Sequence, residues 1–304
     1  MSSATASIII PTYNAAQSVA RALASLEALP NMHIAEILVC DDGSDDETEV
    51  TVRGFADRLP VQYLSQQNLG FRAAAARNLG IKKATGDVSI FIDSDVVLPR
   101  GFLNAHIMRH RNSARARLIF GYRRRVRIAP PPDTQLSQIG EYEPDHREAQ
   151  LAPNGLALKQ SKTPWYFAYS CNISVSGDLR RQLFDEDFIG WGNEDLEFAY
   201  RAVASGAEIA AAPEASLWHI DEGQIRDPFR RVLSEADFTS FVLNTVRMQM
   251  KHASDRELGS HLEADLVGYR VEGDRCVSDL SQRDPLPIRR WATERIIKAS
   301  SCGG

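Results

Sequence analysis

The stretch SIFIDSDVVL, residues 89–98, decides the fold class and raises the question of function. It runs through apolar residues and then places two carboxylates, Asp93 and Asp95, one residue apart. A strand that ends in an Asp-Ser-Asp turn would explain them, since Asp and Ser are common turn residues. A metal site at the end of a buried strand is the alternative. The pair by itself leaves both explanations open.

Composition limits the class of protein. The chain has 304 residues, of which 43% are hydrophobic, so it can bury a large core in one elaborated domain or two. The net charge of -5, with both signs well mixed, gives no general attraction to nucleic acid. Four dispersed cysteines without CxxC spacing suit a reducing compartment. The start, MSSATASIIIPTYN, does not resemble a signal peptide, and no segment is long enough to span a bilayer. We therefore expect a soluble cytoplasmic protein with no transmembrane segment and no nucleic-acid partner.

The first hundred residues alternate short apolar runs with helical patterns, which is typical of βαβ units and a parallel sheet. The predicted strands cover residues 6–14, 35–42, 61–68 and 87–93, and the predicted helices cover 18–29, 43–59 and 71–84. Ligands of open α/β sheets bind beyond the carboxyl ends of the strands. Those ends carry Thr12, Tyr13, Asp41, Asp42, Gln67, Asn68, Asp93 and Asp95. Polar groups are therefore expected to converge at one edge of the sheet.

Two pairs of residues have the spacing of capping boxes. Asn14 precedes Gln17 by three residues, and Ser44 precedes Glu47 by three. This spacing predicts helix starts at both places, with reciprocal hydrogen bonds between the side chains and the main chain.

The pattern changes after about residue 100. Residues 117–128, RLIFGYRRRVRI, alternate apolar and basic residues as an exposed or edge strand would. The arginines could attract an anionic substrate, but a solvated strand face is the favoured interpretation. Residues 130–163 are polar and predict a mobile loop region that could serve as a lid. Further on, the sequence predicts strands at 165–176 and 208–220, a helix at 195–206, and a largely helical, polar segment over the last eighty residues.

Six fragments in this order resemble family 2 of the glycosyltransferases, enzymes with the GT-A fold: SIIIPTYNAAQSVARALASL, EILVCDDGSDDET, NLGFRAAAARNLGI, GDVSIFIDSDVVLP, GWGNEDLEFAYRA and LWHID. The motifs are most similar to those of bacterial chondroitin-synthase-type domains, and they cover roughly residues 7–221. The resemblance implies a Rossmann-like, mostly parallel α/β sheet flanked by helices. Residues 1–100 would be its nucleotide-sugar-binding half and 101–225 its acceptor-binding and catalytic half. Residues 226–304 would form a mainly helical extension.

The resemblance also implies a UDP-sugar site. Thr12 and Tyr13 would hold the uracil, and either Asp41 or Asp42 would accept its N3 hydrogen. Arg77 lies on a helix that the family directs toward the nucleotide, although a surface salt bridge is an equally ordinary role for it. The full set of donor-site residues implied by the resemblance is Pro11, Thr12, Tyr13, Asp41, Asp42, Asn68, Arg77, Asp93, Ser94, Asp95, Trp191 and Gly192.

A metal site follows from the same resemblance. Asp95 would ligate a divalent cation that bridges the two phosphates, while Asp93 would hold the ribose and a metal-bound water. His219, in LWHID, matches a position from which some GT-A enzymes supply a further ligand. Oxygen ligands and a diphosphate favour Mn²⁺ or Mg²⁺, and an imidazole shifts the preference toward Mn²⁺.

GWGNEDLEF, residues 190–198, would carry the chemistry. Inverting transfer needs a carboxylate that takes the acceptor proton, and Asp195 is the predicted general base, with Glu194 orienting the acceptor or sugar. An acidic helix start capped by Asn193 would also explain the two charges, but not the flanking glycines. The flanking glycines suit a flexible loop in which Trp191 forms one side of the sugar and acceptor site. Asp195 stands where retaining polypeptide N-acetylgalactosaminyltransferases usually have Asn, which favours inversion.

The sequence therefore predicts a metal-dependent, inverting glycosyltransferase that uses a UDP-sugar. Its acceptor, a glycan, natural product, lipid or peptide, is not identified. Having one such domain rather than a tandem pair favours a single-transfer enzyme over a polymerase. The alternatives are a retaining N-acetylgalactosaminyltransferase-like enzyme, a nucleotidyltransferase, and a non-catalytic sugar- or peptide-binding module that kept the fold. The absence of an N-terminal Gly-rich phosphate loop counts against the nucleotidyltransferase.

Overall fold

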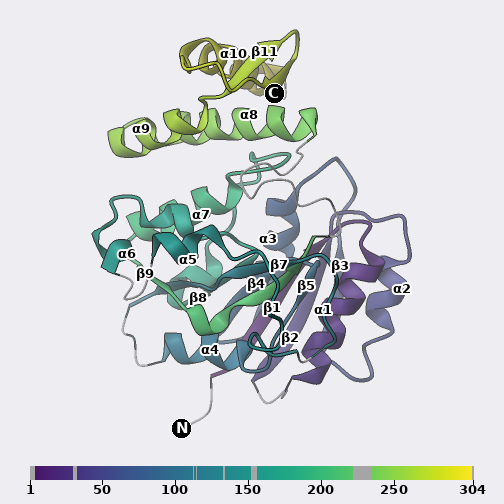
Figure 1. Cartoon of the computed structure of the whole chain (residues 1–304). Coiled ribbons are helices and arrows are strands. Elements are labelled where there is room, and N and C mark those ends of the chain that lie inside the picture. Colours follow the sequence, from purple (N-terminus) through teal and green to yellow (C-terminus); the bar gives the residue numbers. More distant parts are fainter. Residues whose placement is uncertain are drawn as a thin grey trace.

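A seven-stranded sheet in the order β3-β2-β1-β4-β8-β6-β9 organises the chain in the computed structural model (Figure 1). Its strands are β1 (Ala6–Thr12), β2 (Ile34–Asp41), β3 (Val61–Ser65), β4 (Val88–Ile92), β6 (Arg117–Phe120), β8 (Asn172–Ser176) and β9 (Glu208–Ala211). The first four strands run parallel, whereas β8 is antiparallel to both of its neighbours. The structure describes residues 4–29, 33–111, 113, 115–132, 134–151, 156–221 and 234–302. The predicted mostly parallel α/β sheet is confirmed.

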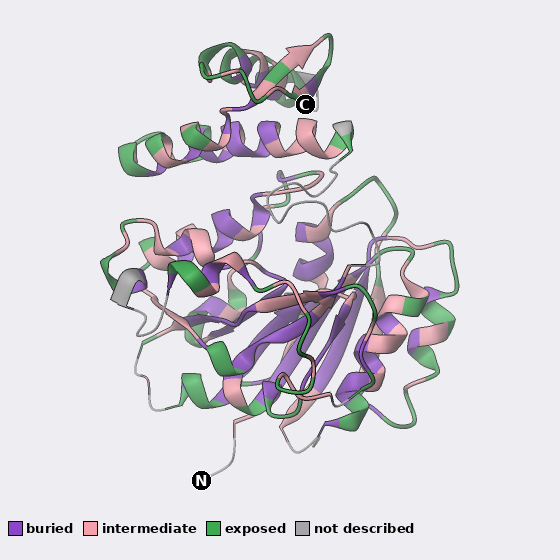
Figure 2. Cartoon of the chain, viewed as in Figure 1, coloured by how far each residue is buried: buried purple, intermediate pink, exposed green. Residues whose placement is uncertain are grey.

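Two apolar layers cover the sheet, so its central strands β1, β2, β4 and β8 are buried on both faces (Figure 2). The helices of these layers are α1 (Ala16–Ala28), α2 (Thr48–Arg53), α3 (Ala73–Lys83), α4 (Phe102–His110) and α7 (Glu194–Ala204). Along β1, Ile9 packs in the cluster that contains the apolar residues of α3 and α7. Its neighbours Ile8 and Ile10 pack in the opposite cluster, with α1 and α4. This alternation is the reason that β1 reads as a continuous aliphatic run.

A second, three-stranded sheet positions part of the site. It consists of β5 (Val96–Val97), β10 (Leu217–Ile220) and β7 (Arg123–Val126), with β10 in the middle. The antiparallel pairing of β10 with β5 sets His219 opposite Val96, the residue after Asp95. Residues far apart in the sequence are thereby brought to one place.

Two predicted strands are in fact interrupted. The segment 117–128 divides at Gly121 into β6 and β7, which belong to different sheets. A Cβ at Gly121 would lie 2.1 Å from the carbonyl oxygen of Ala215, so only glycine fits this close approach. The segment 208–220 divides into β9 and β10 around the 3-10 turn Pro213–Ala215. The prediction of a solvated strand face is wrong for β7, whose arginines 123–125 are half-buried.

Both predicted capping boxes are wrong. Helix α1 begins after Ala15 without a side-chain cap, and Asn14 has a φ of 45°. The Oδ1 of Asn14 accepts a hydrogen bond from the main-chain N–H of Asp45 at 2.9 Å, and the Oγ of Ser44 accepts one from that of Asn14 at 2.8 Å. These side chains tie together the loops that follow β1 and β2, which end side by side because the two strands are parallel neighbours.

The polar region after residue 130 is more ordered than one loop. It contains the short helices α5 (His146–Gln150) and α6 (Leu156–Gln160) and the 3-10 helix Pro164–Phe167. The ion pair between Asp145 and Arg147, with 2.6 Å between Oδ2 and Nη2, is fully buried and anchors this region. The predicted strand at 165–176 is correct only over β8, because its first residues form the 3-10 helix.

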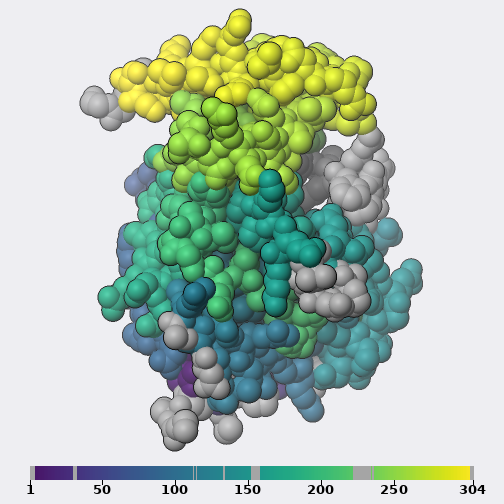
Figure 3. Space-filling view, turned by 90° about the vertical axis from the view of Figure 1, so that its left-hand side faces the viewer, coloured from purple at the N-terminus to yellow at the C-terminus, as the bar shows by residue number. Residues whose placement is uncertain are grey.

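The C-terminal extension contains the helices α8 (Glu235–Lys251), α9 (Arg256–Asp265) and α10 (Leu286–Cys302). It also contains a hairpin that the sequence reading missed, β11 (Tyr269–Glu272) and β12 (Arg275–Ser278). The part of the predicted extension at 226–233 lies outside the described residues. Figure 3 shows the extension seated across one end of the molecule.

The extension has a hydrophobic core of its own, and its helix α9 also packs against the main domain. Val242 and Val246 of α8 pack with Ile288 and Ala292 of α10. Leu262 of α9 belongs instead to the large cluster beside the central sheet. Within the described part of the chain, no helix combines the length and apolarity that crossing a membrane requires.

Candidate functional site

One large cavity of about 1220 Å³ opens at the carboxyl edge of the parallel strands. The sequence-predicted residues that line it are Pro11, Thr12, Tyr13, Asp42, Asn68, Arg77, Asp93, Ser94, Asp95, Trp191, Gly192, Glu194, Asp195 and His219. Of the predicted set, only Asp41 is absent from its walls. The residues come from strands β1 and β10, helices α3 and α7, and the segments that directly follow β2 and β4, so they converge through topology rather than sequence.

The structure separates the roles of the two adjacent carboxylates after β2. Asp41 is fully buried, and its Oδ1 accepts hydrogen bonds from the N–H groups of Gly43 and Ser44, each at 2.7 Å. Its Oδ2 accepts the hydroxyl of Tyr63 at 2.7 Å. Asp42 reaches the cavity wall, where its Oδ2 accepts the N–H of Arg72 at 2.6 Å. Asp41 therefore shapes the turn, and Asp42 is the carboxylate that a ligand in the cavity can contact.

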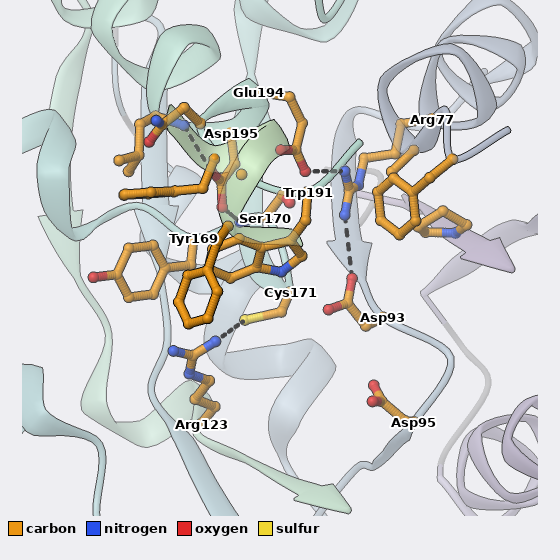
Figure 4. A pocket seen from close by; sticks show the side chains of 18 of the residues that line it. Arg77, Asp93, Asp95, Arg123, Tyr169, Ser170, Cys171, Trp191, Glu194 and Asp195 are labelled. Atoms are coloured by element: carbon orange, nitrogen blue, oxygen red, sulfur yellow. Dashed lines mark hydrogen bonds and ion pairs between the residues drawn. The ribbon is translucent and has the colours of Figure 1, made fainter. Parts of the chain in front are cut away.

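Arg77 joins the two acidic groups of the site (Figure 4). Its Nη1 lies 3.0 Å from Oε1 of Glu194, and its Nη2 lies 3.2 Å from Oδ1 of Asp93. Its side chain is 5% exposed, so it is not a surface salt bridge. Burial lowers the pKa of Arg77, but the charges of Glu194, Asp93 and Asp195 outweigh it and raise the pKa. The guanidinium is a fixed positive charge between the strand end and the helix start.

A candidate metal site lies beside it. Asp93, Asp95 and His219 each offer one ligand atom, and these atoms all lie within 4.8 Å of one another. Nε2 of His219 is 3.4 Å from Oδ1 of Asp95, whereas its buried Nδ1 has no hydrogen-bond partner within the described residues. Two carboxylates and an imidazole suit Mn²⁺, provided that phosphate oxygens complete the coordination.

The acidic pair begins helix α7 at the opposite side of the cavity. Burial raises the pKa of both Glu194 and Asp195, while Arg77 opposes the shift. Oδ2 of Asp195 accepts the N–H of Ser170 at 3.2 Å (Figure 4). Asn193 does not cap the helix through its side chain, which donates instead to Oγ1 of Thr245 at 2.7 Å. The ordinary capped helix start is therefore not what these residues form.

Helix α8 holds the loop that carries Trp191, a contact that the sequence reading missed. Nδ2 of Asn244 donates to the carbonyl oxygens of Gly192 at 2.9 Å and Ile189 at 3.1 Å. The main-chain N–H of Trp191 donates to Oγ of Ser240 at 2.9 Å. Ser240 and Asn244 are one helical turn apart, but polar residues at that spacing are common on any solvated helix. No sequence signal distinguished them.

Comparison with known proteins identifies the family. The profile described as Glycosyl transferase family 2 matches residues 7–170, more than half of the chain. The chain belongs to glycosyl transferase family 2. The predicted recognition is therefore confirmed, including the similarity to chondroitin synthase of Escherichia coli, which is 28% identical over 70% of this chain and 34% of its own length.

Another relative in this family is a validoxylamine A glucosyltransferase of Streptomyces hygroscopicus subsp. jinggangensis. It is 32% identical over 265 residues, 82% of this chain, and this chain spans 61% of that relative's length. Among solved structures, GalNAc-T7 with UDP, GalNAc and Mn²⁺ matches with a TM-score of 0.60 at 19% identity, over 86% of this chain and 51% of that one. This likeness confirms the GT-A fold.

Proposed function

We propose that the chain transfers a sugar from a UDP-sugar to an acceptor hydroxyl, with a divalent metal and with inversion at the anomeric carbon. The observation that carries the proposal is the shared cavity in which Arg77 links Asp93 to Glu194. A donor diphosphate at the candidate metal site would thereby lie across from the acidic pair. Family membership supports sugar transfer and disfavours the nucleotidyltransferase alternative.

The nucleotide would occupy the end of the cavity formed by β1 and β2. Tyr13 is half exposed and offers a ring for stacking on the base, and its hydroxyl accepts Nδ2 of Asn68 at 3.0 Å. Asp42 would accept the N3 hydrogen of uracil. A carboxylate at that point selects a base that presents a hydrogen-bond donor.

The leaving diphosphate would lie near Asp93, Asp95 and His219. A divalent cation held there supplies charge neutralisation as UDP leaves. Arg77 supplies a further positive charge from the protein itself, held in place by its two ion pairs.

Asp195 is the proposed general base. Glu194 is already ion-paired with Arg77, whereas no lysine, arginine or histidine among the described residues forms an ion pair with Asp195. The main-chain N–H of Ser170 orients the carboxylate and leaves it able to accept the acceptor proton. A base on the acceptor side produces inversion by direct displacement. A retaining reaction is the second candidate. It is supported by the likeness in fold to GalNAc-T7, since a retaining N-acetylgalactosaminyltransferase-like enzyme is one of the alternatives that the sequence leaves open.

The sugar and acceptor are narrower proposals. One relative is named a validoxylamine A glucosyltransferase. We therefore propose UDP-glucose as the first donor to test and a natural product as the first class of acceptor. Glycans, lipids and peptides are the other classes of acceptor to be assayed.

Calorimetric titration tests the donor site. UDP should bind with Mn²⁺ and lose most of its affinity with EDTA or in Asp95→Asn, while GDP should bind weakly in every condition. If neither nucleotide binds, the proposed function is wrong. Nucleotide binding without turnover on any donor and acceptor would instead identify a binding module that kept the fold.

A further inference from the structure

The C-terminal extension builds one wall of the cavity from aromatic rings. Trp191 lies 5.6 Å from Phe241 between ring centroids, Phe241 lies 6.1 Å from Tyr269, and Tyr269 lies 5.6 Å from Phe238. All four side chains line the cavity. We call this set the aromatic wall. It begins at Trp191, in the loop that leads into the acidic pair, and therefore starts beside the proposed general base.

One carboxylate lies close to the aromatic wall, near enough for its charge to act on Tyr269. Asp265 lines the cavity, and its Oδ1 accepts the hydroxyl of Tyr166 at 3.1 Å. No lysine, arginine or histidine in the described part of the chain forms an ion pair with it. The carboxylates of the acidic pair differ from it, because Arg77 is ion-paired with Glu194 and the charge of Arg77 also acts to lower the pKa of Asp195. Asp265 is thus a negative group in an apolar surrounding without a protein counter-charge.

Its position in the fold is unfavourable. Asp265 is the last residue of α9, where the helix dipole repels negative charge, and the last turn holds no basic residue. Burial raises the pKa of Asp265 to about 6, and burial together with the charge of Asp265 raises the pKa of Tyr269. One hydrogen bond from Tyr166 does not explain why a charge is kept where the fold opposes it. A ligand that supplies the missing counter-charge would.

We propose that the aromatic wall and Asp265 bind a protonated amino group of the acceptor. An ammonium placed there would gain both an ion pair with the carboxylate and attraction to the ring faces. The hydroxyl of Tyr269 is available to the rest of such an acceptor, and that of Tyr166, which donates its proton to Asp265, can still accept a hydrogen bond. This inference rests on the proposed function, since it specifies the acceptor of the same site.

Matched pairs of small acceptors test it. The protein is first saturated with UDP and Mn²⁺ and then titrated by calorimetry with methyl glucoside or its 2-amino analogue, and with inositol or an amino-inositol. In at least one pair the amine should bind about ten-fold more tightly than its neutral partner. With UDP-glucose, the preferred amine should also increase the release of UDP.

Two variants assign the preference to the carboxylate. Asp265→Asn should reduce the preference to less than about two-fold. It should unfold at the same or a higher temperature, because an unfavourable charge has been removed. Glu263→Gln removes a carboxylate from the same helical turn, where it pairs with Arg289 outside the cavity, and should leave the preference unchanged.

Failure of the amine site can be distinguished from failure of the proposed function. Equal binding of neutral and amino partners, no binding of any amine, or a preference that persists in Asp265→Asn would each overturn this inference. In the first case the wall binds a neutral sugar ring. Failure of the proposed function appears earlier, as failure of UDP to saturate the protein before any acceptor is added.

Discussion

Replacing Asn244 with Ala should uncouple the loop that carries Trp191 from the extension. Asn244 is fully buried, and its amide is the hydrogen-bond donor to the carbonyls of Ile189 and Gly192. Its Oδ1 also accepts Nη1 of Arg247 at 2.7 Å. Removing the donor leaves two loop carbonyls unsatisfied, so the free energy of unfolding should fall by about 2–4 kcal/mol. A displacement of the loop of about 1 Å should lower kcat about 100-fold.

The measurements are urea unfolding, UDP titration and initial rates with UDP-glucose and the best acceptor found. The UDP affinity should change little, because the proposed nucleotide site lies at the ends of β1 and β2, away from Asn244. Gln249→Ala is the matched control, since this amide on the same helix donates to the carbonyl of Gly259 in α9 instead. If Asn244→Ala lowers kcat no more than Gln249→Ala does, the extension does not position the loop that carries Trp191.

Three further results are expected. Asp42→Asn should weaken UDP binding about ten-fold, because this carboxylate faces the cavity. Asp41→Asn should affect UDP binding less and should lower the free energy of unfolding by about 2 kcal/mol, because its carboxylate holds a turn. A larger loss of UDP affinity in Asp41→Asn than in Asp42→Asn would show that the roles are exchanged. Asp195→Asn should reduce turnover about 100- to 10,000-fold while UDP still binds, and near-normal initial rates would exclude it as the base. Burial lowers the pKa of His106 to about 4 and that of His110 to about 3, so the fold holds both neutral. Because the unfolded chain binds these protons near pH 6.5, each histidine should remove about 1.4 kcal/mol of stability per pH unit as the pH falls from 6.5 toward the folded-state pKa. Between pH 7.5 and pH 5 the raised pKa values of Glu194 and Asp265 change the stability in the opposite direction. Compared with the unaltered chain, His106→Asn should therefore lose less stability, or gain more, as the pH falls from 7.5 to 5. An identical pH dependence of the urea midpoint in the two proteins would contradict that assignment.

Sequence reasoning succeeded for features that depend on local pattern and order. Aliphatic runs such as that of β1 predict buried strands, because a strand covered on both faces needs apolar side chains at every position. Polar residues at the strand ends were also expected to converge, and all of the predicted site residues except Asp41 do line one cavity.

It failed where one residue type can serve two purposes. Asn14 and Ser44 have capping spacing, yet each bonds to the neighbouring loop because β1 and β2 end together. The arginines of β7 resemble a solvated face, but residues of the region after 140 contact them: Glu148 pairs with Arg124, and Glu143 pairs with Arg125. In both cases the partner lies too far along the chain for a local pattern to include it.

The sequence by itself determined the sheet, the family and the residue types of the site, because these depend on periodicity and on motifs in a fixed order. Only the tertiary structure decided which carboxylate after β2 faces the cavity, that Arg77 joins Asp93 to Glu194, and that α8 holds the loop that carries Trp191. It also placed Asp265 among the rings of the extension. These relations are distances between residues remote in sequence, and packing fixes such distances only once the elements have come together.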